Sequence, residues 1–140
     1  MKKHILSVIG YVVATFGAQA TSHFIVFADH YSQISFQRPE PIFAFGFLSM
    51  IIQGMILSIV RSKIKASSLM NSLSLSWMLG LFLVSYIGLA EPAHYTVPNI
   101  GAWIFIEFLV GFVQFTLAGF FLNLAHKPVC LSAEAPQEKK

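Results

Sequence analysis

Residues 102–125 read AWIFIEFLVGFVQFTLAGFFLNLA, and Glu107 is the only Asp, Glu, Lys or Arg side chain among them. A helix that crosses the roughly 30 Å apolar core of a bilayer needs about 20 mostly apolar residues. This segment meets that requirement, whereas an amphipathic helix of a soluble protein would carry a charge every few residues. The segment therefore predicts a membrane-spanning helix.

Three further segments have the same character, since residues 5–28, 41–60 and 66–90 contain no Asp, Glu, Lys or Arg. The composition agrees, because 56% of the 140 residues are hydrophobic and only 11% are charged, against about 25% in soluble domains. We expect an all-α polytopic membrane protein, a bundle of four transmembrane helices. This domain would span residues 1–127, followed by a flexible cytoplasmic tail over residues 128–140.

The N-terminal segment has an alternative interpretation. Residues 1–20 resemble a secretory signal, with a lysine pair before an apolar run and the sequence AQA at its end. Apolar residues continue past that point through residues 24–27. We therefore expect an uncleaved first span.

The basic residues predict the orientation, because cytoplasmic loops of membrane proteins are enriched in Lys and Arg. Eight of the nine lie on one side of the predicted spans, and only Arg38 lies on the other. The eight are Lys2, Lys3, Arg61, Lys63, Lys65, Lys127, Lys139 and Lys140. We expect both chain ends in the cytoplasm, and the small size and short loops favour a bacterial inner membrane.

The two halves of the chain share a pattern. The matched positions are Gly46 with Gly111, Gly54 with Gly119, and His30-Tyr31 with His94-Tyr95. The match indicates either two parallel repeats of a two-helix unit, related by an axis along the membrane normal, or a chance similarity between apolar segments. The sequence leaves both interpretations open.

Small residues in these segments predict where helices pack. Glycines eight residues apart lie near one helical face, because 3.6 residues make a turn. Small side chains let helix backbones approach closely in lipid. We expect helix packing at Gly46, Gly54, Ser58, Gly111 and Gly119.

Glu107 and His23 need a specific explanation, because ionisable side chains inside a membrane are costly. Each lies about five residues, roughly 8 Å, inside the same end of its predicted span. We therefore expect a contact between the first and fourth spans that accepts a proton or binds a metal. The alternative is that both are tolerated residues near the boundary of the membrane.

The linkers at the same end carry more imidazole and carboxylate groups, namely Asp29, His30, Glu91 and His94. This combination suits zinc, iron, copper or manganese, with His23, His30 and His94 as candidate metal ligands. His30 and His94 are also candidate haem ligands. Against this, the spacing matches no known metal signature, and polar residues are common at the level of the lipid headgroups. The cofactor stays open.

Three functional hypotheses follow. Small size and short loops favour a non-enzymatic accessory or interaction subunit of a membrane complex, whose partners are the lipid bilayer and either a second copy or another membrane protein. The second hypothesis is a bundle that handles a metal, haem or proton. The third is a membrane enzyme with Glu107 and His23 as acid and base, ranked last because no nucleophile or cofactor motif accompanies them. The net charge of +3 gives no reason to expect a nucleic-acid partner.

Overall fold

The computed structural model describes residues 1–34, 38, 40–64 and 68–127. These residues form helices joined by short connections, with no strand among them. The segments long and apolar enough to cross a membrane are Lys2–Val26, Phe43–Lys63, Leu69–His94 and Ile100–His126. The prediction of an all-helical chain with four such segments is confirmed. The predicted tail lies outside the described residues.

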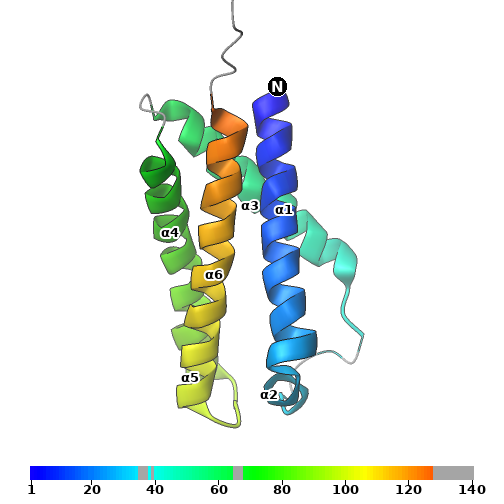
Figure 1. The fold of residues 1–140 in the computed structure, drawn as a ribbon. Helices are drawn as coiled ribbons and strands as arrows, with labels where there is room; N and C mark the ends of the chain where they lie inside the picture. The colour runs from blue at the N-terminus through cyan, green and yellow to red at the C-terminus, as the bar shows by residue number, and fades with distance from the viewer. Residues whose placement is uncertain (35–37, 39, 65–67, 128–140) are drawn as a thin grey trace, which may run out of the picture.

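The order of elements is the same in the two halves (Figure 1). The first half contains α1 (Lys2–Thr21), η1 (Ser22–Val26), α2 (Ala28–Ser32) and α3 (Phe43–Lys63). The second contains α4 (Leu69–Ser85), η2 (Tyr86–Ala90), α5 (Glu91–His94) and α6 (Ile100–His126). η1 and η2 are π-helical turns, which were not predicted from the sequence. Asp29 and His30 lie in α2, and Glu91 and His94 lie in α5, rather than in linkers.

α1 and α6 lie side by side at the centre of the molecule, with α4 against the other side of α6 (Figure 1). α3 packs on α1 and runs obliquely, so that its C-terminal end approaches α4. Every residue from 43 to 49, at the other end of α3, is exposed. If the two halves packed alike, α4 and α3 would contact each other as extensively as α1 and α6 do. They contact each other far less. The packing of the two halves is therefore less alike than their order of elements.

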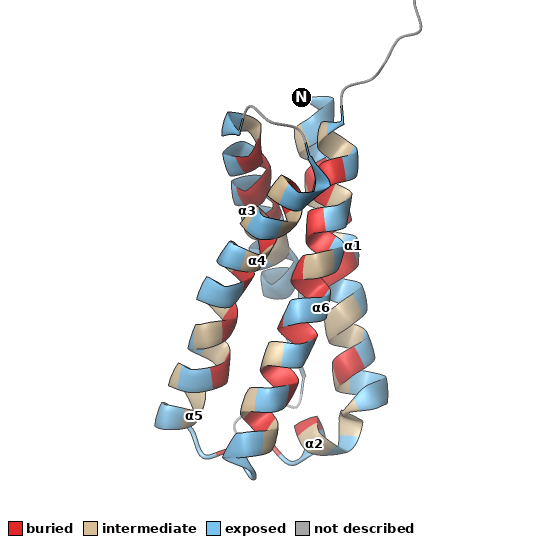
Figure 2. Cartoon of the chain, turned by 60° about the vertical axis from the view of Figure 1, so that its left-hand side comes forward, coloured by how far each residue is buried: buried red, intermediate tan, exposed pale blue. Residues whose placement is uncertain are grey.

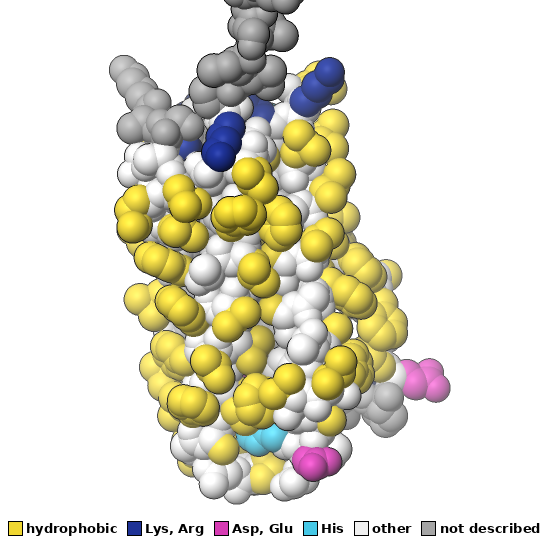
Figure 3. Space-filling view, viewed as in Figure 1, with side chains coloured by type: hydrophobic (Ala, Val, Ile, Leu, Met, Phe, Trp, Pro, Cys, Tyr) yellow, Lys and Arg dark blue, Asp and Glu magenta, His cyan; other side chains and the backbone are white. Residues whose placement is uncertain are grey.

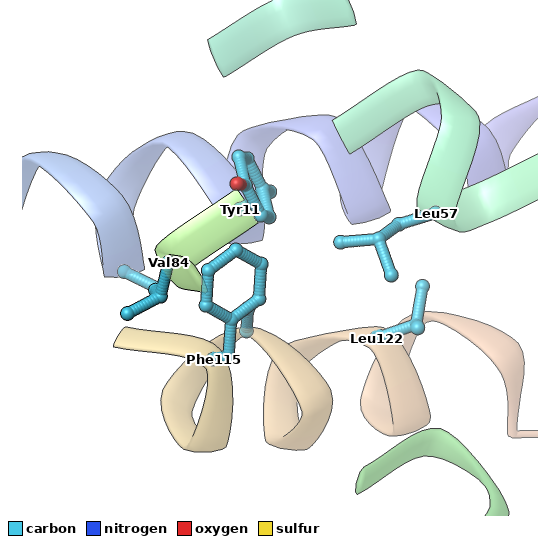
Figure 4. Packing of buried hydrophobic residues seen from close by; sticks show 7 residues of the cluster. Tyr11, Leu57, Val84, Phe115 and Leu122 are labelled. Atoms are coloured by element: carbon cyan, nitrogen blue, oxygen red, sulfur yellow. The ribbon is translucent and has the colours of Figure 1, made fainter. Parts of the chain in front are cut away.

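The apolar core lies where these helices face one another, as the buried stripes in Figure 2 show. Tyr11, Leu57, Val84, Phe115 and Leu122 belong to one cluster, drawn in Figure 4. The ring centroids of Tyr11 and Phe115 are 6.1 Å apart. Large apolar side chains also cover the outer surface of all four long helices, as expected of a bundle surrounded by lipid.

Small residues allow the close helix approaches. A Cβ at Gly54 would lie 3.2 Å from the Cα of Val8 on α1. A Cβ at Gly111 would overlap the Val84 side chain of α4, and one at Gly119 would lie 3.0 Å from the Cα of Leu73. Gly46 differs, because a Cβ there would meet nothing within 4 Å. The packing expected at Gly46 is therefore not formed within a single chain, since α3 diverges from the bundle at this end.

Gly111→Ala should destabilise the protein by about 1–3 kcal/mol, because the β-branched Val84 has little freedom to move away. Gly46→Ala is the matched control and should be neutral or slightly stabilising, since Ala favours helix over Gly. Both can be measured by unfolding in mixed micelles titrated with dodecyl sulfate. Equal effects of the two substitutions would contradict the close approach of α6 to α4.

Candidate functional site

Charged side chains separate to the two ends of the bundle (Figure 3). One end, called here the basic end, carries Lys2, Lys3, Arg61, Lys63 and Lys127. The other, called here the acidic end, carries Asp29, Glu40 and Glu91, and Glu107 lies in the half of the bundle next to it. Arg38, which is exposed, is the only Lys or Arg at the acidic end of the described chain.

Glu107 is buried on α6, with 7% of its surface exposed. The Tyr31 hydroxyl donates a hydrogen bond of 2.8 Å to its Oε1 atom. Tyr31 comes from α2, the short helix after η1, and is itself buried. Burial is the main cause that raises the pKa of the Tyr31 hydroxyl above its usual value, so this group stays protonated and acts as a donor.

His23 lies in η1 and stacks on the ring of Tyr31, with ring centroids 3.7 Å apart and an interplanar angle of 14°. Its Nδ1 atom is 3.0 Å from the Gln19 carbonyl oxygen. A carbonyl oxygen only accepts, so Nδ1 carries the hydrogen in this contact and Nε2 of the neutral ring is an acceptor. Tyr31 therefore contacts both His23 and Glu107, where a direct contact between those two residues was expected.

The remaining predicted residues are dispersed over the acidic end. His30 is half-buried, with its ring centroid 5.3 Å from that of Tyr31, and its Nε2 atom has no hydrogen-bond partner. Asp29 is exposed. Over the described residues, no group of three or more His, Cys, Asp or Glu side chains is arranged to hold a metal ion.

The second-half counterparts lie on α5. His94 is exposed and its Nδ1 atom donates to the Ala90 carbonyl oxygen at 2.8 Å. Glu91 is half-buried. Within the described part of the chain, no hydrogen bond or ring contact joins either residue to His23 or His30. The site that the structure assembles is therefore the one around Glu107.

Next to Glu107 lies a cavity of about 200 Å³, called here the polar groove. It is lined by Thr15, Gln19, Gly46, Ser49, Met50, Gln53, Leu83, Val84, Ile87, Glu107, Gly111, Gln114 and Phe115. These residues come from all four spans. The polar groove thus lies between α3, which runs obliquely, and the other three long helices.

Two short hydrogen-bond chains line the polar groove. Gln19 Nε2 donates to Gln114 Oε1 at 2.8 Å, and Gln114 Nε2 donates to Thr15 Oγ1 at 3.2 Å. On the α3 side, the hydroxyl of Tyr11 donates to Gln53 Oε1 at 2.7 Å, and Gln53 Nε2 donates to Ser49 Oγ at 3.1 Å. The part that α1 takes in these hydrogen bonds was not predicted from the sequence. A signal was present, because polar side chains recur every four residues along α1 at positions 7, 11, 15, 19 and 23.

No protein-family model, curated protein or solved structure matches this chain. Its chemistry is therefore inferred from the geometry. Glu107 is a buried carboxyl group with one oxygen bonded to Tyr31, and the described chain places no buried Lys or Arg beside it. Such a group either carries a proton or meets a cation that the chain does not supply.

Tyr31→Phe should destabilise the protein by about 1–3 kcal/mol, because Glu107 loses its donor while remaining buried. Tyr86→Phe removes the hydroxyl of an exposed tyrosine and should change stability by less than about 0.5 kcal/mol. Unfolding in mixed micelles measures both. In a Glu107→Leu background, the cost of Tyr31→Phe should vanish, and full additivity of the two substitutions would show that the hydrogen bond contributes nothing.

Proposed function

We propose that this chain is a four-span membrane protein that binds a small organic cation at Glu107, in the polar groove. The observation that carries the proposal is a buried carboxyl group that faces a cavity and has no basic partner in the described chain. A carboxylate inside an apolar bundle is costly unless an opposite charge approaches it. An ammonium group that reaches Glu107 would supply that charge.

The size and lining of the polar groove favour a small and polar ligand. Its volume of about 200 Å³ equals that of about six to seven water molecules. Amide and hydroxyl groups of Thr15, Gln19 and Gln114 lie beside the carboxyl group and can accept or donate further hydrogen bonds. A ligand that carries one ammonium group and a few further atoms fits both properties.

We also propose that the protein is inserted in a bacterial inner membrane with its basic end in the cytoplasm. The supporting observations are the four apolar helices and the separation of charge in Figure 3. Short loops on the cytoplasmic side of a membrane are enriched in Lys and Arg. In this orientation Glu107 and the polar groove belong to the outer half of the bilayer.

A duplication of a two-helix unit is a further part of the proposal. It is supported by the shared order of long helix, π-helical turn, short helix and long helix in the two halves. The two π-helical turns occupy residues 22–26 and 86–90. The oblique course of α3 then distinguishes the first half from the second.

A second candidate function is an interaction subunit, as a homodimer or with another membrane protein. The observation that favours it is the exposed end of α3, where residues 43–49 leave the bundle and Gly46 has open space around it. A helix from a partner could approach Gly46 closely. It would also shield the polar groove from lipid.

Cysteine labelling tests the orientation. In a Cys130→Ser background, Ser32→Cys and Thr96→Cys should react with a membrane-impermeant maleimide added to intact cells, and Lys63→Cys should react only after the cells are opened. All three residues are exposed in the described chain, so access and not burial decides the result. Reaction of Lys63→Cys in intact cells would reverse the orientation or refute the four spans.

Thermal shifts test the cation site. Purified protein in detergent should melt at a higher temperature with methylammonium or ethylammonium chloride than with sodium chloride at equal ionic strength. Glu107→Gln should abolish the difference, whereas Glu40→Gln, at an exposed carboxylate of the same end, should retain it. An equal response in Glu107→Gln, or no response in the wild type, would refute the cation site and favour the interaction subunit.

A further inference from the structure

Arg61 lies near the C-terminal end of α3, at the basic end, and only 2% of its surface is exposed. Its Nε atom donates to Ser72 Oγ at 2.8 Å, and Nη1 donates to the Ile64 carbonyl oxygen at 3.3 Å. Nη2 is enclosed and has no hydrogen-bond partner. A guanidinium group is always protonated in proteins. Arg61 therefore carries a full positive charge into the interior, and its Nη2 atom has no acceptor there.

No acidic side chain of the described chain balances this charge. Its acidic residues, Asp29, Glu40, Glu91 and Glu107, all belong to the acidic half of the bundle. Around Arg61, Lys3 and Lys63 add more positive charge at the same end. A buried charge without a counter-charge is strongly unfavourable, so an anion from outside the described chain is expected here.

The guanidinium group also lies at the N-terminus of α4. Ser72, which accepts from Arg61, is in the first turn of this helix, and the Ser68 side chain caps it by accepting from the backbone N–H of Asn71. The first N–H groups of a helix have no acceptor within the helix. Together with the helix dipole they attract anions.

One turn before Arg61, polar contacts anchor α3 to α1 and α6. Ser58 lies at this point and is fully buried. Its Oγ atom is 2.8 Å from His4 Nδ1 on α1 and 3.2 Å from His126 Nε2 on α6. A hydroxyl group can donate to one ring and accept from the other, so one serine joins three helices at the basic end.

We propose that Arg61 and the first turn of α4 form a binding site for a phosphate group at the basic end. The planar donor fork of arginine matches the oxygen atoms of phosphate. The bond from Nη1 to Ile64 is explained by capping of α3, but capping leaves Nη2 without a partner. Nη2 is enclosed, so the phosphate must part the end of α3 from the first turn of α4, and it then bridges them.

Such a phosphate can come from the headgroup of an anionic lipid or from a free phosphate ion. Full-length protein is purified in a maltoside detergent, which contains no phosphate, and melting is followed by the fluorescence of Trp77 and Trp103. Inorganic phosphate and short-chain phosphatidylglycerol are added separately, against chloride at equal ionic strength. A higher melting temperature with the lipid alone identifies a headgroup site, and a rise with both identifies a site open to free phosphate.

Two variants test the residue assignment. Arg61→Gln should weaken phosphatidylglycerol binding, measured by native mass spectrometry, by at least about tenfold. The matched control Lys63→Gln removes an exposed positive charge two residues away and should weaken it by no more than about fivefold, the effect of one surface charge. Equal weakening in the two variants would overturn the site.

If Arg61→Gln fails to fold, the melting temperatures of the wild-type protein with phosphate and phosphatidylglycerol still decide the question. No rise in melting temperature with either compound overturns the proposal. The carboxylates of Glu134 and Glu138 in the C-terminal segment are the competing anions. If the full-length double variant Glu134→Gln, Glu138→Gln is less stable than the wild type, and the wild type does not respond to phosphate, these carboxylates occupy the site and the proposal is wrong.

Discussion

The hydrogen bond from Tyr31 to Glu107 is the interaction on which the acidic half of this bundle depends. It joins residues far apart in the sequence and draws α2 against α6, so that the ring of His23 can stack on Tyr31. Trp103 strengthens the same end by donating to the Ile87 carbonyl oxygen in η2. A buried polar group needs a hydrogen-bond partner inside the protein, and these partners join the short helices to α6.

The basic end is organised differently, and the contrast explains the shape of the molecule. There Ser58 contacts rings on α1 and α6, while Arg61 reaches the first turn of α4. All four long helices thus meet at one end. At the other end, residues 43–49 of α3 are exposed and make no side-chain hydrogen bond to another helix of the described chain. The polar groove is a consequence of this difference.

Hydropathy alone was sufficient to predict the four apolar helices, because the need for long uncharged segments in a membrane is severe. Glu107 and His23 were recognised by their depth, but the role of Tyr31 was not, since it depends on a contact between α2 and α6. The groove was missed for a similar reason, because the course of α3 is set by tertiary packing. The polar residues at four-residue spacing on α1 were a readable signal, since such residues share one helical face.

The π-helical turns mark positions where this sequence can lose one residue without a change of register. In η1 the amide of Phe27 bonds to the Ser22 carbonyl oxygen at 2.9 Å, five residues back, where an α-helix would use a spacing of four. A π-helical turn holds one residue more than an α-helical turn. The loss of a single residue within η1 would therefore let regular α-helix form there while Tyr31 still faces Glu107. Alignments should place a one-residue gap within η1, so that the residue facing the carboxyl group stays matched.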